Sequence, residues 1–149
     1  GYFDIKYMTK QYLKDLAERG SEPARNGFTK AKILFCNDEE IGNILPRIPV
    51  FQKKEKEEKL LSFYSDFWLN YHYFLKSCPI DGYMKMHTIS EIIYSIYRMI
   101  LQENEILFDC NRRLEKQVES ISEDTAGLVR LARVLEVSPG YTRCRQICG

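Results

Sequence analysis

Five cysteines and two histidines are the residues of this chain whose side chains are most able to form a reactive or metal-binding site. The cysteines are Cys36, Cys78, Cys110, Cys144 and Cys148, and the histidines are His72 and His87. Structural zinc sites use four ligands at short paired spacings, and no Cys-x-x-Cys pair occurs in the sequence. The spacing therefore predicts no metal centre.

Catalytic residues are not indicated either. General base catalysis by His72 or His87 would need a nucleophile and an orienting carboxylate, and no spacing in the sequence fixes either one. The paired carboxylates Glu39–Glu40 and Glu57–Glu58 are typical of a helix cap and of a solvated face that also carries lysines. No glycine-rich segment forms a phosphate-binding loop. We therefore predict no catalytic residue, no cofactor and no enzymatic activity.

The cysteines allow two interpretations. Cys36, Cys78 and Cys110 can be small buried apolar groups, as in many cytosolic proteins. Alternatively, two disulfides form and one thiol remains. The polar segment 141–149 contains Cys144 and Cys148, and exposed cysteines persist better when oxidised, which favours secretion over a cytoplasmic location. Candidate pairings are Cys78 with Cys110, if the chain doubles back between them, and Cys36 with Cys144 or Cys148.

Length and charge limit the classes of partner. A chain of 149 residues with 44% hydrophobic residues is predicted to form one domain over residues 1–149, with 141–149 as a cysteine-containing tail. A net charge of +1 gives no basic surface for nucleic acid. Charged residues interrupt every apolar run before the roughly 18 residues that a membrane span needs. Nucleic-acid binding and membrane insertion are therefore not expected.

The apolar spacing predicts an all-α fold, a bundle of four to six helices. Expected helices cover residues 3–19, 41–45, 52–77, 88–118 with a break near 109–111, and the segment between Ser122 and Ser138. Asn37-Asp38-Glu39-Glu40 offers the start of the second of these helices, and Ser122 offers a cap for the last. Residues 20–27 are expected to form a surface loop. Residues 28–35 are consistent with either a short helix or an extended crossover. The start at Thr88 rests on the capping-box sequence Thr88-Ile89-Ser90-Glu91.

The segment from Leu60 to Leu75 is rich in aromatic residues. Three- and four-residue steps join Phe63, Tyr64, Phe67, Trp68, Tyr71, Phe74 and Leu75. Leu69 and Tyr73 fall outside this stripe, so the predicted helix is apolar around most of its circumference. Such a helix lies either at the centre of a bundle or at a dimer interface. For the stripe itself, a core location is favoured over a groove for a partner.

The order of elements resembles interferon-gamma and its relatives among the helical cytokines. The resemblance rests on the first helix, the loop from Gly20 to Gly27, the string Leu60-Leu61-Ser62-Phe63-Tyr64 in an apolar helix, and the closing Leu135-Glu136-Val137-Ser138-Pro139. It implies an all-α dimer in which two chains interlock through their C-terminal helices. The five cysteines depart from that family, so a disulfide-stapled monomeric cytokine is the close alternative.

The resemblance also implies a function and contact residues. It implies a secreted cytokine that binds cell-surface receptor chains, brings them together and performs no catalytic step. The receptor-contact candidates are Lys14, Glu18, Ser21, Glu22, Arg25 and Asn26. The alternative is an intracellular or viral adaptor domain in which the aromatic helix, or a groove beside it, captures a partner helix.

Overall fold

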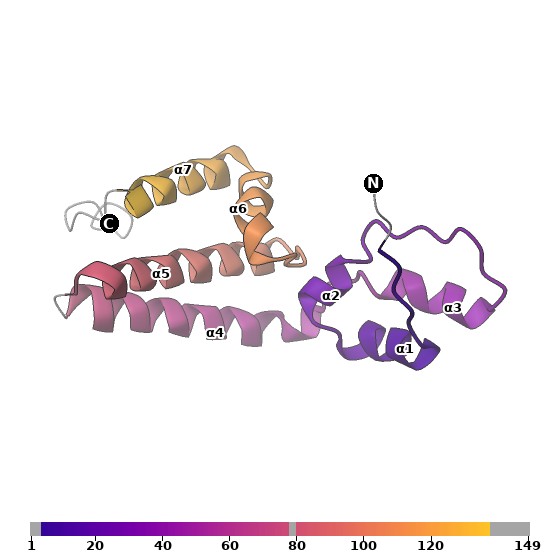
Figure 1. The fold of residues 1–149 in the computed structure, drawn as a ribbon. Helices are drawn as coiled ribbons and strands as arrows, with labels where there is room; N and C mark the ends of the chain where they lie inside the picture. The colour runs from indigo at the N-terminus through magenta and orange to yellow at the C-terminus, as the bar shows by residue number, and fades with distance from the viewer. Residues whose placement is uncertain (1–3, 78–79, 138–149) are drawn as a thin grey trace. The chain divides into compact units, whose positions relative to one another are not determined.

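The chain folds into helices. A computed structural model describes residues 4–77 and 80–137, and within these ranges it contains seven α-helices and no strand (Figure 1). The α-helices are α1 (Lys10–Arg19), α2 (Glu22–Asn26), α3 (Glu39–Ile44), α4 (Lys56–Trp68), α5 (Gly82–Glu103), α6 (Asn111–Glu119) and α7 (Glu123–Val137). The 3₁₀-helices η1 (Leu45–Arg47) and η2 (Lys53–Glu55) and the π-helix η3 (Leu69–Lys76) complete the described elements. The predicted all-α class is confirmed, but seven α-helices exceed the predicted four to six.

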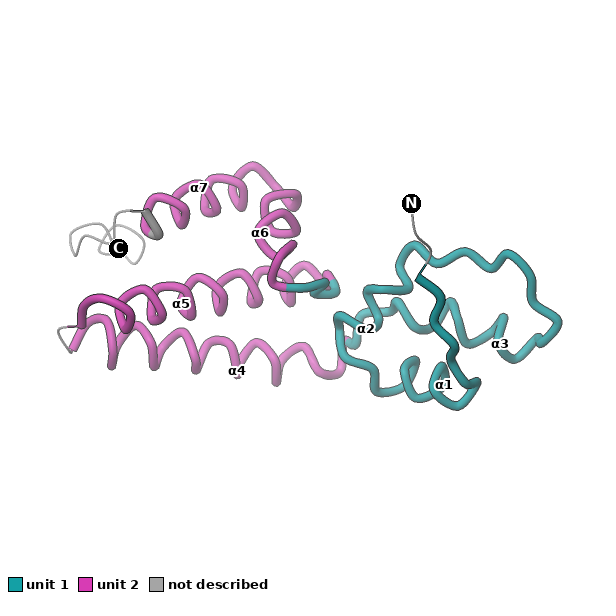
Figure 2. Tube along the Cα trace, in the orientation of Figure 1, with its two compact units in different colours: residues 1–52, 107–110 teal, residues 53–106, 111–149 magenta. Residues whose placement is uncertain are grey.

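The contacts within the chain divide it into two compact units (Figure 2). Unit 1 comprises residues 1–52 and 107–110, and unit 2 comprises residues 53–106 and 111–149. The segment 107–110 therefore belongs with the N-terminal residues, although it follows α5 in the sequence. The single domain over residues 1–149 stays a prediction, and its tail, 141–149, lies outside the described residues.

Unit 1 is built on a small apolar core between α1, α3 and η1, formed by Leu13, Leu16, Ala17, Ile44 and Ile48. The predicted helix start at residue 3 is wrong for the described residues 4–9, which form no helix. The start lies instead at Thr9, whose hydroxyl accepts the Tyr12 amide at 3.1 Å and satisfies one of the unpaired amides of the first turn. The apolar residues before it, Ile5, Tyr7 and Met8, are all exposed.

The prediction of a surface loop at residues 20–27 is wrong, because this segment contains the helix α2. Its Arg25 side chain is fully buried. It donates hydrogen bonds to the carbonyl oxygens of Gly20 (Nε, 2.8 Å), Ile48 (Nη1, 3.0 Å) and Ala17 (Nη2, 2.9 Å). The guanidinium group therefore ties the end of α1 to the segment after η1.

The predicted helix after Asp38 is confirmed as α3. The Asp38 carboxylate accepts the Glu40 amide at 2.9 Å, which is a standard N-cap. Lys10 on α1 pairs with Asp38 at 2.5 Å and with Glu40 at 3.1 Å, and Lys14 also pairs with Glu40. The undecided segment 28–35 contains no helix, and residues 31–37 are exposed.

Unit 2 is a helical hairpin with two further helices. The rod formed by α4 and η3 runs antiparallel to α5, and α6 and α7 pack on α5 (Figure 1). Between α4 and α5, the guanidinium carbon of Arg98 lies 4.6 Å from the centre of the Phe63 ring. Within α5, Arg98 Nη1 donates to the Tyr94 hydroxyl at 2.8 Å. At the open end of the hairpin, Lys56 pairs with Glu103 at 3.2 Å.

The predicted start of α5 at Thr88 is wrong. The helix begins six residues earlier, and Thr88 is buried inside it. Gly82 supplies the start, since its φ of +52° is a conformation that other residues rarely adopt. His87, expected before the helix, therefore lies within α5, where its ring stacks on Tyr83.

The predicted long helix over 88–118 is divided into α5 and α6. The chain leaves the helical path over residues 104–110, earlier than the expected break near 109–111. At the end of α5, the Asn104 side chain donates to the Ile100 carbonyl at 2.8 Å. The predicted start of α7 is confirmed, because the Thr125 amide donates to the Ser122 hydroxyl at 3.2 Å.

Candidate protein-binding face on unit 2

The helix predicted over residues 52–77 is present as η2, α4 and η3, and the π-helical part changes which side chains are buried. In an uninterrupted α-helix, Leu75 would follow Leu61 by about four turns and lie on the same face. In the structure, Leu61 is 66% exposed and Leu75 is 8% exposed. The wider turns of η3 therefore rotate its last residues, and Leu75 contributes to the core of unit 2.

The rod has an inner face that contacts α5. Phe63 meets Tyr94 of α5 in an edge-to-face contact with ring centres 6.3 Å apart. Phe67 and Tyr71 follow on the same side, with parallel rings 5.9 Å apart. These three members of the aromatic stripe are half-buried, in keeping with the core location favoured for it.

The opposite side of the rod is exposed and mostly apolar, and we call it the outer face. It is formed by Leu61, Tyr64, Ser65, Trp68, Leu69 and Tyr73. The five large residues of this set are between 48% and 66% exposed. Steps of three and four residues place them side by side along the helix. For Tyr64 and Trp68, the core location favoured for the aromatic stripe is wrong, because the stripe continues onto the exposed side of the rod. In the sequence, the positions of Leu69 and Tyr73 outside the stripe were the sign of this exposed side.

Ring contacts fix the side chains of the outer face. The Tyr64 and Trp68 rings are 6.2 Å apart, and the Trp68 and His72 rings are 3.6 Å apart. His72 also meets the edge of Tyr71. The neighbours of His72 are thus aromatic rings, and the environment is suited to stacking. Ser65, the small member of the face, donates its hydroxyl hydrogen to the Leu61 carbonyl at 2.8 Å.

Opposite charges lie at the two ends of the outer face. Glu57 and Glu58 are exposed one turn before Leu61, and Lys76 is exposed one turn after His72. Within the described ranges, Glu57, Glu58 and Lys76 take part in no ion pair. These charges are therefore available to a molecule that lies along the rod.

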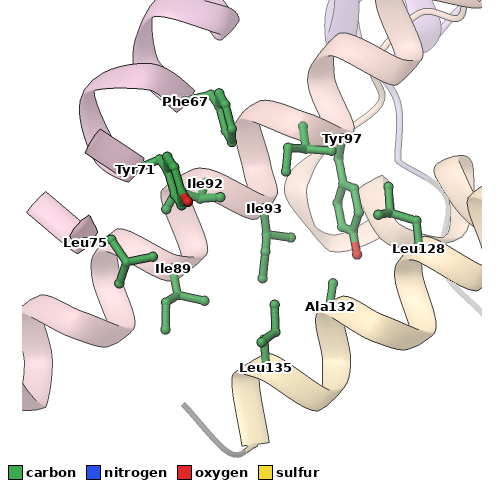
Figure 3. A pocket seen from close by; sticks show the side chains of 11 residues that line it. Phe67, Tyr71, Leu75, Ile89, Ile92, Ile93, Tyr97, Leu128, Ala132 and Leu135 are labelled. Atoms are coloured by element: carbon green, nitrogen blue, oxygen red, sulfur yellow. The ribbon is translucent and has the colours of Figure 1, made fainter. Parts of the chain in front are cut away.

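A narrow apolar cleft lies on the inner side, between the rod, α5 and α7 (Figure 3). Its walls include Phe67 and Leu75 from the rod, Ile93 from α5 and Leu135 from α7. The cavity volume is about 40 Å³, far below that of a typical ligand pocket. It carries no acid or base beyond tyrosine hydroxyl groups, so it has no evident chemistry. Among the described residues, no group of His, Cys, Asp and Glu side chains is suited to holding a metal ion.

The six predicted receptor-contact residues all lie in unit 1, and four of them are accessible. Glu18 and Ser21 are exposed, and Lys14 and Asn26 are half-buried. Lys14 is engaged with Glu40, and this contact is the main cause that lowers the pKa of the Glu40 carboxyl below its usual value. For these four residues, receptor contact stays a prediction.

The other two candidates, Glu22 and Arg25, are buried, which is not the position of a surface contact residue. Glu22 accepts the Phe108 amide at 3.1 Å and so joins the segment 107–110 to α2 within unit 1. Acid and base side chains in a Pro- and Gly-containing segment are usually solvated, and the sequence does not show that both turn inward.

The structure describes two of the five cysteines. Cys36 is exposed, Cys110 is half-buried, and the two are not bonded to each other. Cys78, Cys144 and Cys148 lie outside the described residues. Each predicted disulfide includes one of these three, so the pairings stay predictions.

Comparison with known proteins gives no relative: no protein-family model matches the chain, and no curated protein or solved structure matches it. Within residues 4–77 and 80–137, none of the helices combines the length and the apolar character that crossing a membrane requires.

Proposed function

We propose that this chain is a helical protein ligand that acts by contact with other proteins, and that the outer face of α4 and η3 is one of its contact surfaces. The supporting observation is the exposure of five large apolar side chains along one side of a continuous rod. Contiguous apolar patches on soluble proteins mark interaction sites. Trp68, Tyr64 and Tyr73 belong to the residue types that contribute most to binding at interface centres.

In its narrower form, the proposal is a secreted cytokine that binds cell-surface receptor chains and brings them together. The resemblance to the interferon-gamma relatives supports this form, as does the all-helical frame. The accessible residues Lys14, Glu18, Ser21 and Asn26 of unit 1 would contact the receptor.

The second candidate is an intracellular or viral adaptor domain whose outer face binds a partner helix. The exposure of Cys36 is compatible with this alternative, since an exposed cysteine stays a reduced thiol in the cytosol.

Two measurements on the purified full chain test the cytokine form. Alkylation of the unfolded, non-reduced protein counts its free thiols by mass spectrometry, and one labelled cysteine out of five is expected. Fluorescently labelled protein should bind a panel of primary cells saturably and be displaced by unlabelled protein.

A charge reversal at the predicted contact sharpens the second measurement. Glu18→Lys should weaken cell binding about tenfold, as for an interface charge pair. The control Asp124→Lys, on the exposed start of α7, should leave binding unchanged. Five labelled cysteines together with no saturable binding would refute the cytokine form and leave the adaptor form.

A further inference from the structure

We infer that the outer face of α4 and η3 binds the same face of a second copy of this chain, with the two rods antiparallel. This inference rests on the proposed function, because it names the occupant of that contact surface. Two separate features of the face support it, namely its end charges and the size of its central residues. The interface would be distinct from the interlocked C-terminal helices that the resemblance implies.

The end charges favour an antiparallel copy. The acidic pair lies at the N-terminal end of the rod and Lys76 at the C-terminal end, and none of the three forms an ion pair within the described residues. Of the lysines at the acidic end, Lys53, Lys56 and Lys59 are paired with other carboxylates, so the two free carboxylates there outnumber the one exposed lysine, Lys54. When two rods run antiparallel, the end with Glu57 of one copy meets the end with Lys76 of the other. Twofold symmetry forms this contact twice. A parallel pair would instead place like charges together at both ends.

The central residues favour the same register. Leu61, Tyr64, Ser65 and Trp68 stand at positions i, i+3, i+4 and i+7, which is the arrangement of a hole on a helix surface. Ser65 has the smallest side chain of the four and forms the floor of this hole. Trp68 of the second copy is the large exposed side chain at the corresponding height, and it would fill the hole as a knob.

Both features place the twofold axis at one position. Pairing Glu57 with Lys76 puts the axis near residue 66, because the rise per residue is smaller in the π-helix η3 than in α4. Inserting Trp68 into a hole centred between Tyr64 and Ser65 also puts the axis near residue 66. The end charges and the knob are therefore satisfied together, with no shift of one rod along the other. An arbitrary apolar partner would require neither coincidence.

The test is sedimentation velocity of the full chain over a roughly hundredfold range of loading concentration. The expected result is a reversible monomer–dimer equilibrium. Lys76→Glu should raise the dimer dissociation constant about tenfold, because it replaces attraction with repulsion at two symmetric contacts. The double variant Glu57→Lys, Lys76→Glu should recover most of the lost affinity, with the remaining difference due to Glu58. The control Lys116→Glu changes the same charge on the exposed side of α6 and should have no effect.

Two further variants test the centre of the face. Trp68→Ala removes the knob, and Ser65→Tyr closes the hole, and each should abolish the dimer while circular dichroism shows an intact helical fold. A chain that stays monomeric at every concentration would overturn the inference, as would a dimer unaffected by the Lys76 and Ser65 substitutions.

The outcomes separate this inference from the proposed function. A monomer that still binds cells saturably overturns only the self-pairing. A dimer with the expected response to all four variants, but with no binding to cells and five free thiols, refutes only the cytokine form.

Discussion

Replacing Arg25 by Met should destabilise unit 1 strongly. The Met side chain retains most of the apolar stem of Arg but removes three hydrogen bonds of 2.8 to 3.0 Å to backbone carbonyls. A hydrogen bond to a charged group contributes a net of about 1.5 to 3 kcal/mol. Part of that loss is offset, because the variant no longer has to bury a cation at the cost of its hydration. We expect the opening free energy of unit 1 to fall by about 4 kcal/mol, within the range for breaking a buried charged network.

Native-state hydrogen exchange measures this change where it occurs. A loss of about 4 kcal/mol corresponds to roughly a thousandfold faster exchange of the protected amides of α1, such as those of Leu16 and Ala17. The control is Arg19→Met on the same helix. Arg19 is exposed and makes an i,i+4 ion pair with Asp15 at 3.2 Å, which is worth only a few tenths of a kcal/mol. Exchange in the control should change less than about threefold.

The result also separates two roles of Arg25. Unchanged exchange in Arg25→Met, with loss of cell binding, would show that Arg25 is a surface contact and would refute the role derived from its burial. Faster exchange in α1, with a parallel loss of all binding that depends on unit 1, would show a structural role.

Three other changes have definite expected outcomes. Ile93→Ala, beside the apolar cleft, should lower the unfolding free energy of unit 2 by about 3 kcal/mol in urea titrations followed by the fluorescence of Trp68, the single tryptophan, and a loss below about 1 kcal/mol would contradict its core position. Gly82→Ala should cost about 1 kcal/mol in the same assay, because φ at that position is +52°, and an unchanged midpoint would argue against this start of α5. Lys10 lowers the pKa of Asp38 below 3.8, so the stabilisation by this contact is complete above that value and is lost as pH falls through the lower pKa of the folded state. The protection factors of the α3 amides, which take account of the intrinsic slowing of exchange at low pH, should therefore fall in acid, and the fall should be smaller in Lys10→Met; an equal fall in both proteins would exclude this contact as the cause.

The sequence predicted the start of a helix correctly where a local capping interaction alone determines that start. Asp38 and Ser122 cap the helices they were expected to start, because a side-chain oxygen bonded to a nearby amide depends little on distant contacts. The Thr88 capping box failed although its pattern is complete. The same residue types are compatible with a helix interior, and a start six residues earlier buries Thr88 and Ile89.

The outer face could not be predicted from the spacing of apolar residues, for a different reason. Periodicity assumes 100° per residue, and eight residues of π-helix accumulate a rotation that the sequence does not signal. Leu75 therefore changes sides relative to Leu61, and the division into inner and outer faces is set by packing on α5. Likewise, the burial of Arg25 could not be predicted from the sequence, because its hydrogen-bond acceptors, the Ala17 and Ile48 carbonyls, are brought together only by the tertiary fold.

Self-pairing through the outer face would explain how one small chain brings two receptor chains together. A monomer needs two different receptor-binding surfaces for this task, whereas a twofold dimer presents one surface twice. The four accessible candidates of unit 1 then suffice as a single receptor contact per chain, and the outer face of unit 2 supplies the pairing. This division of roles predicts that Trp68→Ala leaves the affinity of one chain for one receptor chain unchanged and reduces signalling, because it removes bivalency without touching the receptor contact. Equal loss of single-site affinity and of signalling would place the receptor on the outer face itself.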